Sequence, residues 1–281
     1  MDNNEWLLWA ESMILNHPRC IEAENVAELM GYGVSETDAV GLLLAGLLGL
    51  DTEHSERDRN RYNNYLRPSL KKLDHSLFDS NPYLKEIRWH NTRNDTIELT
   101  TLHYEPYELM PCGDTVFDIN QRLNAPIGFF DQRWPYPALL ENGRIWMSVT
   151  PNEIITMQRG IERAHGDVVV LGMGMGYYAM QAARKAEVSR VRIVELNTKI
   201  IESVGSMVLP QCKGWEKMEV IQADAMDYMA QGGRADYIYA DLWHDVGDGL
   251  EIYKHLKGLE PLWEGAECDY WIEDSMLCYM A

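Results

Sequence analysis

Short apolar segments alternate with segments of helical pattern along the second half of the chain. Val168 to Leu171 is an uninterrupted apolar run rich in β-branched residues, which is typical of a strand buried on both faces of a sheet. Further strands are predicted at 191–195, 219–225, 237–241 and 269–274, and helices between them, as at 177–185 and 251–259. Alternating strands and helices predict an α/β fold with a Rossmann-like parallel sheet in the order 3-2-1-4-5.

The first 80 residues have a helical pattern instead. One helix is expected to stop near His17, a second to span 21–30, and a third to begin after Ser35, whose side chain would cap it. Two helices around a glycine turn are superficially like a DNA-reading motif. The third helix almost lacks basic and amide side chains, however, and core packing is therefore the favoured interpretation.

A basic stretch, 57–72, is the exception to the acidic character of the chain. It could bind an acidic substrate or an RNA backbone. The favoured alternative is that it pairs with acidic residues of this same protein.

Residues 81–149 form a β-rich region by pattern. Alternation predicts a hairpin of strands 85–90 and 96–104, and further strands at 115–120 and 144–149. The proline-broken aromatic segment 124–137 is too apolar for an ordinary surface loop. It could be a pocket lid or could pack over the sheet.

A third domain, 150–281, begins with a helix capped by Thr150, with Pro151 at its first position. Glu153 then stands where it reaches back to the cap. Capping explains Glu153 fully, and we do not count it among the candidate site residues. The predicted organisation is a helical domain (1–80), a β-rich region with the aromatic segment (81–149) and a Rossmann-like domain (150–281).

Composition narrows the class of partner. The 281 residues include 25 basic and 44 acidic ones, a net charge of −19 that repels polyanions, so nucleic acid and anionic membranes are disfavoured and a small-molecule substrate is favoured. The five cysteines are scattered without metal-ligand spacing, and no metal site is predicted. The N-terminus lacks the positive region of a signal peptide, and the expected location is the cytoplasm.

The loop after the first predicted strand carries glycines at alternate positions, Gly172, Gly174 and Gly176. Glycine permits positive φ and leaves no Cβ between backbone and ligand, and the loop opens a helix, whose N-terminus suits a nucleotide. The dinucleotide fingerprint GxGxxG would place its third glycine at Tyr177. The observed pattern is GxGxG, which disfavours NAD.

With the strands that follow it, this loop resembles the first motif of class I S-adenosylmethionine-dependent methyltransferases and of the related spermidine synthases. The resemblance implies S-adenosylmethionine as cofactor. It implies a ribose contact at Glu195 and an adenine contact at Asp224, each at the end of a strand. The implied cofactor-binding residues are Gly172, Met173, Gly174, Gly176, Glu195, Leu196, Asp224 and Ala225.

The chain departs from these families in two places. Seven residues follow the fifth strand, which leaves no room for the usual terminal hairpin, so the sheet edge would be bare or covered by the helical domain or by a second copy in a homodimer. Spermidine synthases carry an aspartate in the glycine loop, where this chain has Met173 and Met175. That difference disfavours aminopropyl transfer.

The candidate catalytic residues follow the fourth strand. Asp241 stands where spermidine synthases place the carboxylate that deprotonates the amine, and repulsion by neighbouring acids would raise its pKa; alternatively, it caps the following turn. His244 is a second candidate base, although a lone loop histidine is more often solvated. Asp245 and Asp248 lack His or Cys partners for a metal. Three functions stay open: a methyltransferase acting on a small molecule or a protein, an aminopropyl or related alkyl transferase, and a non-catalytic nucleotide-binding module.

Overall fold

The computed structural model describes residues 1–280, and its chain forms two compact units. The first comprises 1–77 and 103–135, and the second comprises 78–102 and 136–280. The chain passes between them within helix α6 (His75–Asp79) and within strands β3 (Ile97–Tyr104) and β8 (Trp134–Glu141). The β-rich region predicted at 81–149 therefore contributes residues to both units.

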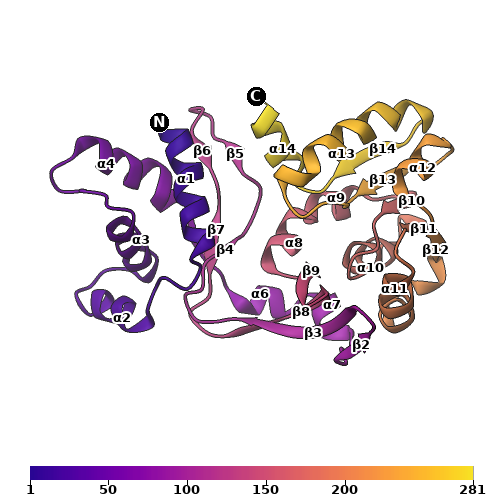
Figure 1. The fold of residues 1–281 in the computed structure, drawn as a ribbon, viewed down its shortest axis with the longest axis horizontal. Coiled ribbons are helices and arrows are strands. Elements are labelled where there is room, and N and C mark those ends of the chain that lie inside the picture. Colours follow the sequence, from indigo (N-terminus) through magenta and orange to yellow (C-terminus); the bar gives the residue numbers. More distant parts are fainter. Residues whose placement is uncertain (281) are drawn as a thin grey trace. The chain divides into compact units, whose positions relative to one another are not determined.

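The second unit is built on a five-stranded parallel sheet with the order β12-β11-β10-β13-β14 (Figure 1). Its strands are β10 (Gly166–Leu171), β11 (Val188–Glu195), β12 (Met218–Gln222), β13 (Tyr237–Ala240) and β14 (Glu267–Tyr270). Numbered along the chain, this is the order 3-2-1-4-5. The predicted fold class is confirmed, and the strand order reverses beside β10, where such sheets bind ligands.

Helices connect these strands, namely α10 (Tyr177–Ala183), α11 (Thr198–Ile200), α12 (Ala225–Ala230) and α13 (Val246–Leu259). Strand β10 is preceded along the chain by α6 (His75–Asp79), α7 (Pro82–Glu86), α8 (Pro151–Thr156) and α9 (Gln158–Arg163), and β14 is followed by α14 (Glu273–Met280). The capping box predicted at Thr150 and Glu153 is present at the start of α8. Within the described residues, α14 rather than a strand follows β14, which lies at the sheet edge.

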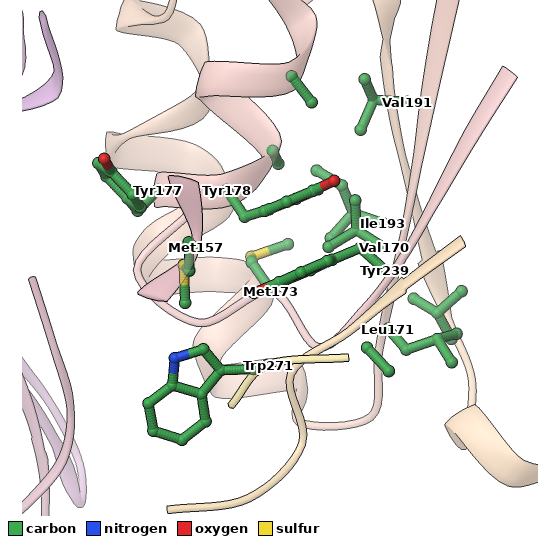
Figure 2. Close-up of a cluster of buried hydrophobic side chains, with 14 of the residues drawn as sticks. Met157, Val170, Leu171, Met173, Tyr177, Tyr178, Val191, Ile193, Tyr239 and Trp271 are labelled. Atoms are coloured by element: carbon green, nitrogen blue, oxygen red, sulfur yellow. The ribbon is translucent and has the colours of Figure 1, made fainter. Parts of the chain in front are cut away.

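Apolar and aromatic side chains pack α10 against the sheet. The rings of Tyr178 and Tyr239 lie parallel with centroids 3.7 Å apart, as Figure 2 shows. Tyr178 donates its hydroxyl to the Gly160 carbonyl at 3.0 Å. A Cβ at Gly160 would lie 2.6 Å from the Tyr239 ring, so only glycine lets α9 approach this stack. The packing fixes the start of α10, and with it the glycine loop.

A second sheet has the order β2-β3-β8-β9, with β2 (Thr92–Asn94) and β9 (Arg144–Ser148) at its edges. The hairpin prediction is half right, because β3 matches 96–104 but its partner is β2. The strand predicted at 85–90 is wrong. Asn81 accepts the Tyr83 amide at 2.9 Å and Pro82 opens the first turn, so helix α7 runs on to Glu86, and residues 87–90 form no strand.

The first unit is mostly helical and also holds short strands. They are α1 (Asn3–Asn16), α2 (Ala23–Gly31), α3 (Glu36–Leu47), α4 (Glu56–Arg61), α5 (Arg67–Ser69), β1 (Leu70–Lys72), β4 (Met110–Pro111), β5 (Val116–Phe117), β6 (Leu123–Asn124) and β7 (Ile127–Phe129). Ser35 accepts the Asp38 amide and caps α3 as predicted.

The aromatic segment 124–137 forms part of a core and is not a lid. Its strand β7 is the middle strand of the sheet β1-β7-β4, and Phe129 and Phe130 are fully buried. Trp134 stacks on Phe130 at a centroid distance of 5.1 Å. Packing is therefore the correct alternative for this segment, since its bulky side chains fill the interior behind a short strand.

The basic stretch pairs with acids of its own unit. Arg67 contacts Asp38 at 2.6 Å, and Lys72 lies 2.7 Å from Asp131 and also pairs with Glu36. These pairs support the favoured alternative. Separately, no helix within residues 1–280 is both long and apolar enough to cross a lipid bilayer.

Candidate functional site

A cavity of about 210 Å³ opens in the second unit where β10 and β13 end. It is lined by the glycine loop, strand β9, helix α8, the start of α10 and the segment after β13. Its lining residues are Ile145, Trp146, Met147, Ser148, Glu153, Met157, Val170, Gly172, Met173, Gly174, Met175, Tyr177, Tyr178, Asp241, Trp243, His244 and Trp271. Because β10 and β13 meet at the point where the strand order reverses, the cavity lies at the crevice expected for ligands.

The three loop glycines all have positive φ: 93° at Gly172, 54° at Gly174 and 74° at Gly176. They serve different purposes. A Cβ at Gly172 would lie 2.2 Å from the backbone oxygen of Asp241, so this glycine lets two strand ends approach. At Gly176 a Cβ would instead meet Leu209 and Val208.

Gly174 is the glycine with room on its open side. A Cβ there would meet only the thioether of Met147, at 3.0 Å from the methyl carbon. Met147 is a flexible side chain on β9, and such a chain moves more cheaply than backbone. Gly174 is therefore the loop position where a ligand can come close to the backbone.

Tyr83 on α7 holds this loop from behind. Its side chain is fully buried, and its hydroxyl donates a hydrogen bond to the carbonyl of Met175. Its ring meets the Tyr177 ring edge-on at 5.4 Å. The sequence pattern did not identify Tyr83, because helix α7, which carries it, was not predicted.

Glu195 lies at the end of β11 and is tied directly to the loop. Its carboxylate accepts the Met173 amide at 3.0 Å and the Asn197 amide at 2.7 Å, one on each oxygen. Each carboxylate oxygen has two lone pairs, so both retain capacity for a ribose hydroxyl. Glu195 does not line the cavity and stands on the β11 side of the loop.

Asp224 is the N-cap of α12, beyond the end of β12. Its Oδ1 accepts the amides of Met226 at 2.8 Å and Asp227 at 3.1 Å, and Ala225 is the first residue of the helix. Leu196 is 62% exposed. Asp224, Ala225 and Leu196 do not line the cavity, and neither does Gly176. Apart from Gly176, the predicted residues thus form two groups, one at the cavity and one along the ends of β11 and β12.

Asp241 is the first residue after β13, and its amide donates to the Leu171 carbonyl at 3.0 Å. Its carboxyl group lines the cavity and makes no hydrogen bond within residues 1–280, so the alternative that it caps the following turn is wrong. Burial, and secondly the negative charge of Glu153, raise the pKa of Asp241 to about 7. The predicted direction of this shift is correct, but burial contributes more than repulsion.

Glu153 is the site residue that the sequence analysis set aside. Its carboxylate caps α8 as predicted, accepting the Thr150 amide at 2.9 Å and the Thr150 hydroxyl. It also lines the cavity, and burial raises its pKa despite the hydrogen bonds from Thr150. The capping motif accounts for a glutamate at this position, but it does not show that the carboxylate also faces the cavity.

His244 combines a half-exposed side chain with a fixed orientation. Its Nδ1 lies 2.9 Å from Oδ2 of Asp248, and its ring meets the Trp146 ring edge-on at 4.6 Å. Asp248 also accepts the Asp245 amide in the capping box of α13. His244 thus lines the cavity, whereas Asp245 and Asp248 serve as helix caps. No group of three or more His, Cys, Asp or Glu side chains in the described part of the chain is arranged to hold a metal.

Comparisons with known proteins give fold similarity only. No family model matches the chain, and no curated protein matches its sequence. Solved structures that match include precorrin 8w decarboxylase from Methanobacterium thermoautotrophicum (18% identity, TM-score 0.30, 39% of this chain and 56% of that chain). Others are spermidine synthase from Thermotoga maritima (14%, 0.32, 43% and 48%) and a dimethyladenosine transferase from Plasmodium falciparum (20%, 0.31, 43% and 42%).

The matched region spans about half the length of these proteins. Their TM-scores are below 0.5, and such values carry no information on activity. The function must be inferred from the chain's own site.

The residues around the loop offer carboxylate acceptors and an approachable backbone, a set whose chemistry fits an adenosyl cofactor. Gly174 has open space above its backbone, apart from a movable methionine. Glu195 keeps lone pairs for hydroxyl groups, and its bond to Met173 places it beside the loop. S-adenosylmethionine would be held by these residues and by Asp224.

Proposed function

We propose that this protein is an S-adenosylmethionine-dependent methyltransferase. The observation that carries the proposal is the shared cavity, in which the open glycine Gly174 and the unpartnered carboxyl group of Asp241 line one space at the switch point of the sheet. S-adenosylmethionine, when bound, supplies an electrophilic methyl group. The residues of the chain then have to orient the acceptor and remove its proton.

Asp241 is the proposed general base. A carboxylate with a pKa near 7 takes a proton far better than an ordinary aspartate, and about half of the molecules are ionised at neutral pH. The proton would pass from an N–H or O–H group of the acceptor to the Asp241 carboxylate. His244, oriented by Asp248, is the second candidate for this role.

The acidic lining favours an amine as acceptor. Glu153 and Asp241 both line the cavity, while no lysine or arginine is among its described lining residues. The aromatic side chains of Trp146, Trp243 and Trp271 form part of the wall, and such rings favour cations. A small amine meets these conditions better than an anionic acceptor.

The same lining supports a second candidate, transfer of an aminopropyl or related alkyl group. The carboxylate of S-adenosylmethionine would find no lysine or arginine among the described residues that line the cavity, whereas a decarboxylated cofactor lacks that group. The glycine loop, however, offers Met173 and Met175 where an acid would be needed for the ammonium. Methyl transfer is therefore the first candidate.

One incubation separates these functions. The protein is mixed with S-adenosylmethionine, or with its decarboxylated form, and with a panel of small amines, and the by-product is identified by mass spectrometry. Methyl transfer yields S-adenosylhomocysteine, and aminopropyl transfer yields methylthioadenosine. Binding without either by-product across the panel would favour the non-catalytic module, and an Asp241→Asn variant with undiminished turnover would remove Asp241 as the base.

A further inference from the structure

Glu153 uses only part of its carboxylate to cap α8. The Thr150 amide and hydroxyl both donate to Oε2, whereas Oε1 has a single long contact, 3.5 Å from the Ser148 hydroxyl. A cap needs one acceptor oxygen. The carboxylate is thus fixed in place by its cap, on the wall of the cavity, with the second oxygen nearly free.

The cavity holds this charge without a counter-charge. Its titratable lining residues are Glu153 from α8, Tyr177 and Tyr178 from α10, and Asp241 and His244 from the segment after β13. Burial raises the pKa of both tyrosines, so they are neutral. The Asp241 carboxylate accepts no hydrogen bond from residues 1–280. A buried carboxylate without a partner is costly, and a cation bound in the cavity would relieve that cost.

We propose that Glu153, together with Asp241, makes this site discriminate between the positively charged sulfonium of S-adenosylmethionine and the neutral thioether of S-adenosylhomocysteine. The inference rests on the proposed function and extends it to a residue that no motif indicates. The two compounds share their adenosine, amino and carboxylate groups and differ by the methyl group and its charge. Only a group that responds to that charge can separate them strongly.

Discrimination of this kind has a consequence for turnover. Once the methyl group is transferred, the spent cofactor is neutral at sulfur and loses its attraction to the two carboxylates. S-adenosylhomocysteine would then dissociate from this site faster than S-adenosylmethionine does. Glu153 is a specificity-determining residue in this scheme, and it takes no part in the proton transfer.

The test measures binding alone and needs no acceptor. Calorimetry at pH 8 gives the dissociation constants of S-adenosylmethionine and S-adenosylhomocysteine for the wild type, for Glu153→Gln and for Thr150→Val. Thr150→Val removes the side-chain hydrogen bonds of Thr150 in the cap but keeps the charge of Glu153, and is therefore the matched control. Asp241→Asn, which leaves the cap intact, provides a second charge-removing variant.

We expect the wild type to bind S-adenosylmethionine about tenfold more tightly than S-adenosylhomocysteine, a ratio in keeping with charges a few ångström apart near a protein surface. Glu153→Gln and Asp241→Asn should each reduce this ratio severalfold by weakening S-adenosylmethionine alone, and Thr150→Val should preserve it. An unchanged ratio in both charge-removing variants, with S-adenosylhomocysteine still bound, overturns the inference and leaves the proposed function standing. If the wild type binds neither compound, the proposed function fails as well.

Discussion

Asp241 is the residue at which the proposed function and the stability of the fold make opposite demands. Its pKa of about 7 in the folded protein lies well above the ordinary value of 3.8, so the fold disfavours its ionised form. Between these two pH values the folded state binds more protons than the unfolded state, and stability falls as the pH rises. The penalty is absent at pH 3–4 and complete above about pH 8.

Asp241→Asn should therefore stabilise the protein at pH 8, by at most about 4 kcal/mol, and leave it unchanged near pH 4. Urea unfolding at several pH values measures this difference. Asp245→Asn, at the exposed N-cap of α13, is the control, because asparagine caps as well as aspartate and should give no pH-dependent gain. A loss of stability at pH 8 in Asp241→Asn would show that the carboxylate is structural.

Among individual residues, the sequence predicted the acids that stand at strand ends, but it did not identify Glu153, which stands on a helix, as a residue of the cavity. Glu195 and Asp241 each follow a run of β-branched or aromatic residues, and that local pattern is visible without a structure. Glu153 follows a capping motif that is complete in itself. Its place on the cavity wall depends on how α8 packs near β13, and no local pattern carries that information.

The glycine loop is the element on which the site depends, and its glycines should not be equivalent. Gly172→Ala would place a Cβ against the backbone oxygen of Asp241 at 2.2 Å, which forces a strand to shift. We expect a loss of about 3 kcal/mol or more. Gly174→Ala meets only the Met147 thioether and should cost about 1–2 kcal/mol for its positive φ.

Thermal and urea unfolding of the two variants, measured side by side, test this order. Gly174→Ala should nevertheless impair S-adenosylhomocysteine binding more than its small stability loss implies, because the new methyl group lies on the open face of the loop. Equal stability losses, or normal ligand affinity in Gly174→Ala, would contradict the division of roles among the glycines.

Helix α7 supports the loop through one buried hydroxyl group. Tyr83→Phe removes the donor to the Met175 carbonyl and leaves that carbonyl without its partner, at a cost of about 1–3 kcal/mol. S-adenosylhomocysteine affinity should fall as the loop loosens. Tyr253→Phe is the matched control, since Tyr253 is also buried but does not line the cavity, and its hydroxyl contacts Glu273 and no loop carbonyl. If both variants bind equally well, Tyr83 does not position the loop.

Elements were predicted best where the pattern was long and locally consistent. The strands β10, β11 and β13 agree with the prediction to within a few residues, because a buried parallel strand needs an apolar run. The prediction of a strand at 85–90 is wrong because Asn81 and Pro82 start a helix. The tyrosine of that helix, Tyr83, then contacts the distant glycine loop. The sequence could not tell whether the aromatic segment 124–137 is a lid or part of a core, because a pocket wall and a core use the same residue types.

For the whole molecule, the sheet order could be predicted, whereas the division into two units could not. Right-handed crossovers and alternating elements leave few topologies for five parallel strands, and 3-2-1-4-5 is among them. The chain passes from one unit to the other within α6, β3 and β8, so each unit contains segments distant in sequence. Such a division depends on non-local contacts, which composition and periodicity do not reveal.

The central claim is that the ends of β10 and β11 bind an adenosyl cofactor, and a calorimetric titration with S-adenosylhomocysteine and with NAD tests it most directly. We predict one site for S-adenosylhomocysteine and no heat from NAD. Glu195→Ala should weaken binding by about 1.5–3 kcal/mol, the scale of a lost hydrogen bond to a charged group. Glu219→Ala, an exposed acid on the neighbouring strand, should bind as the wild type does. Binding of NAD without S-adenosylhomocysteine, or equal affinity in Glu195→Ala and the wild type, would contradict the account.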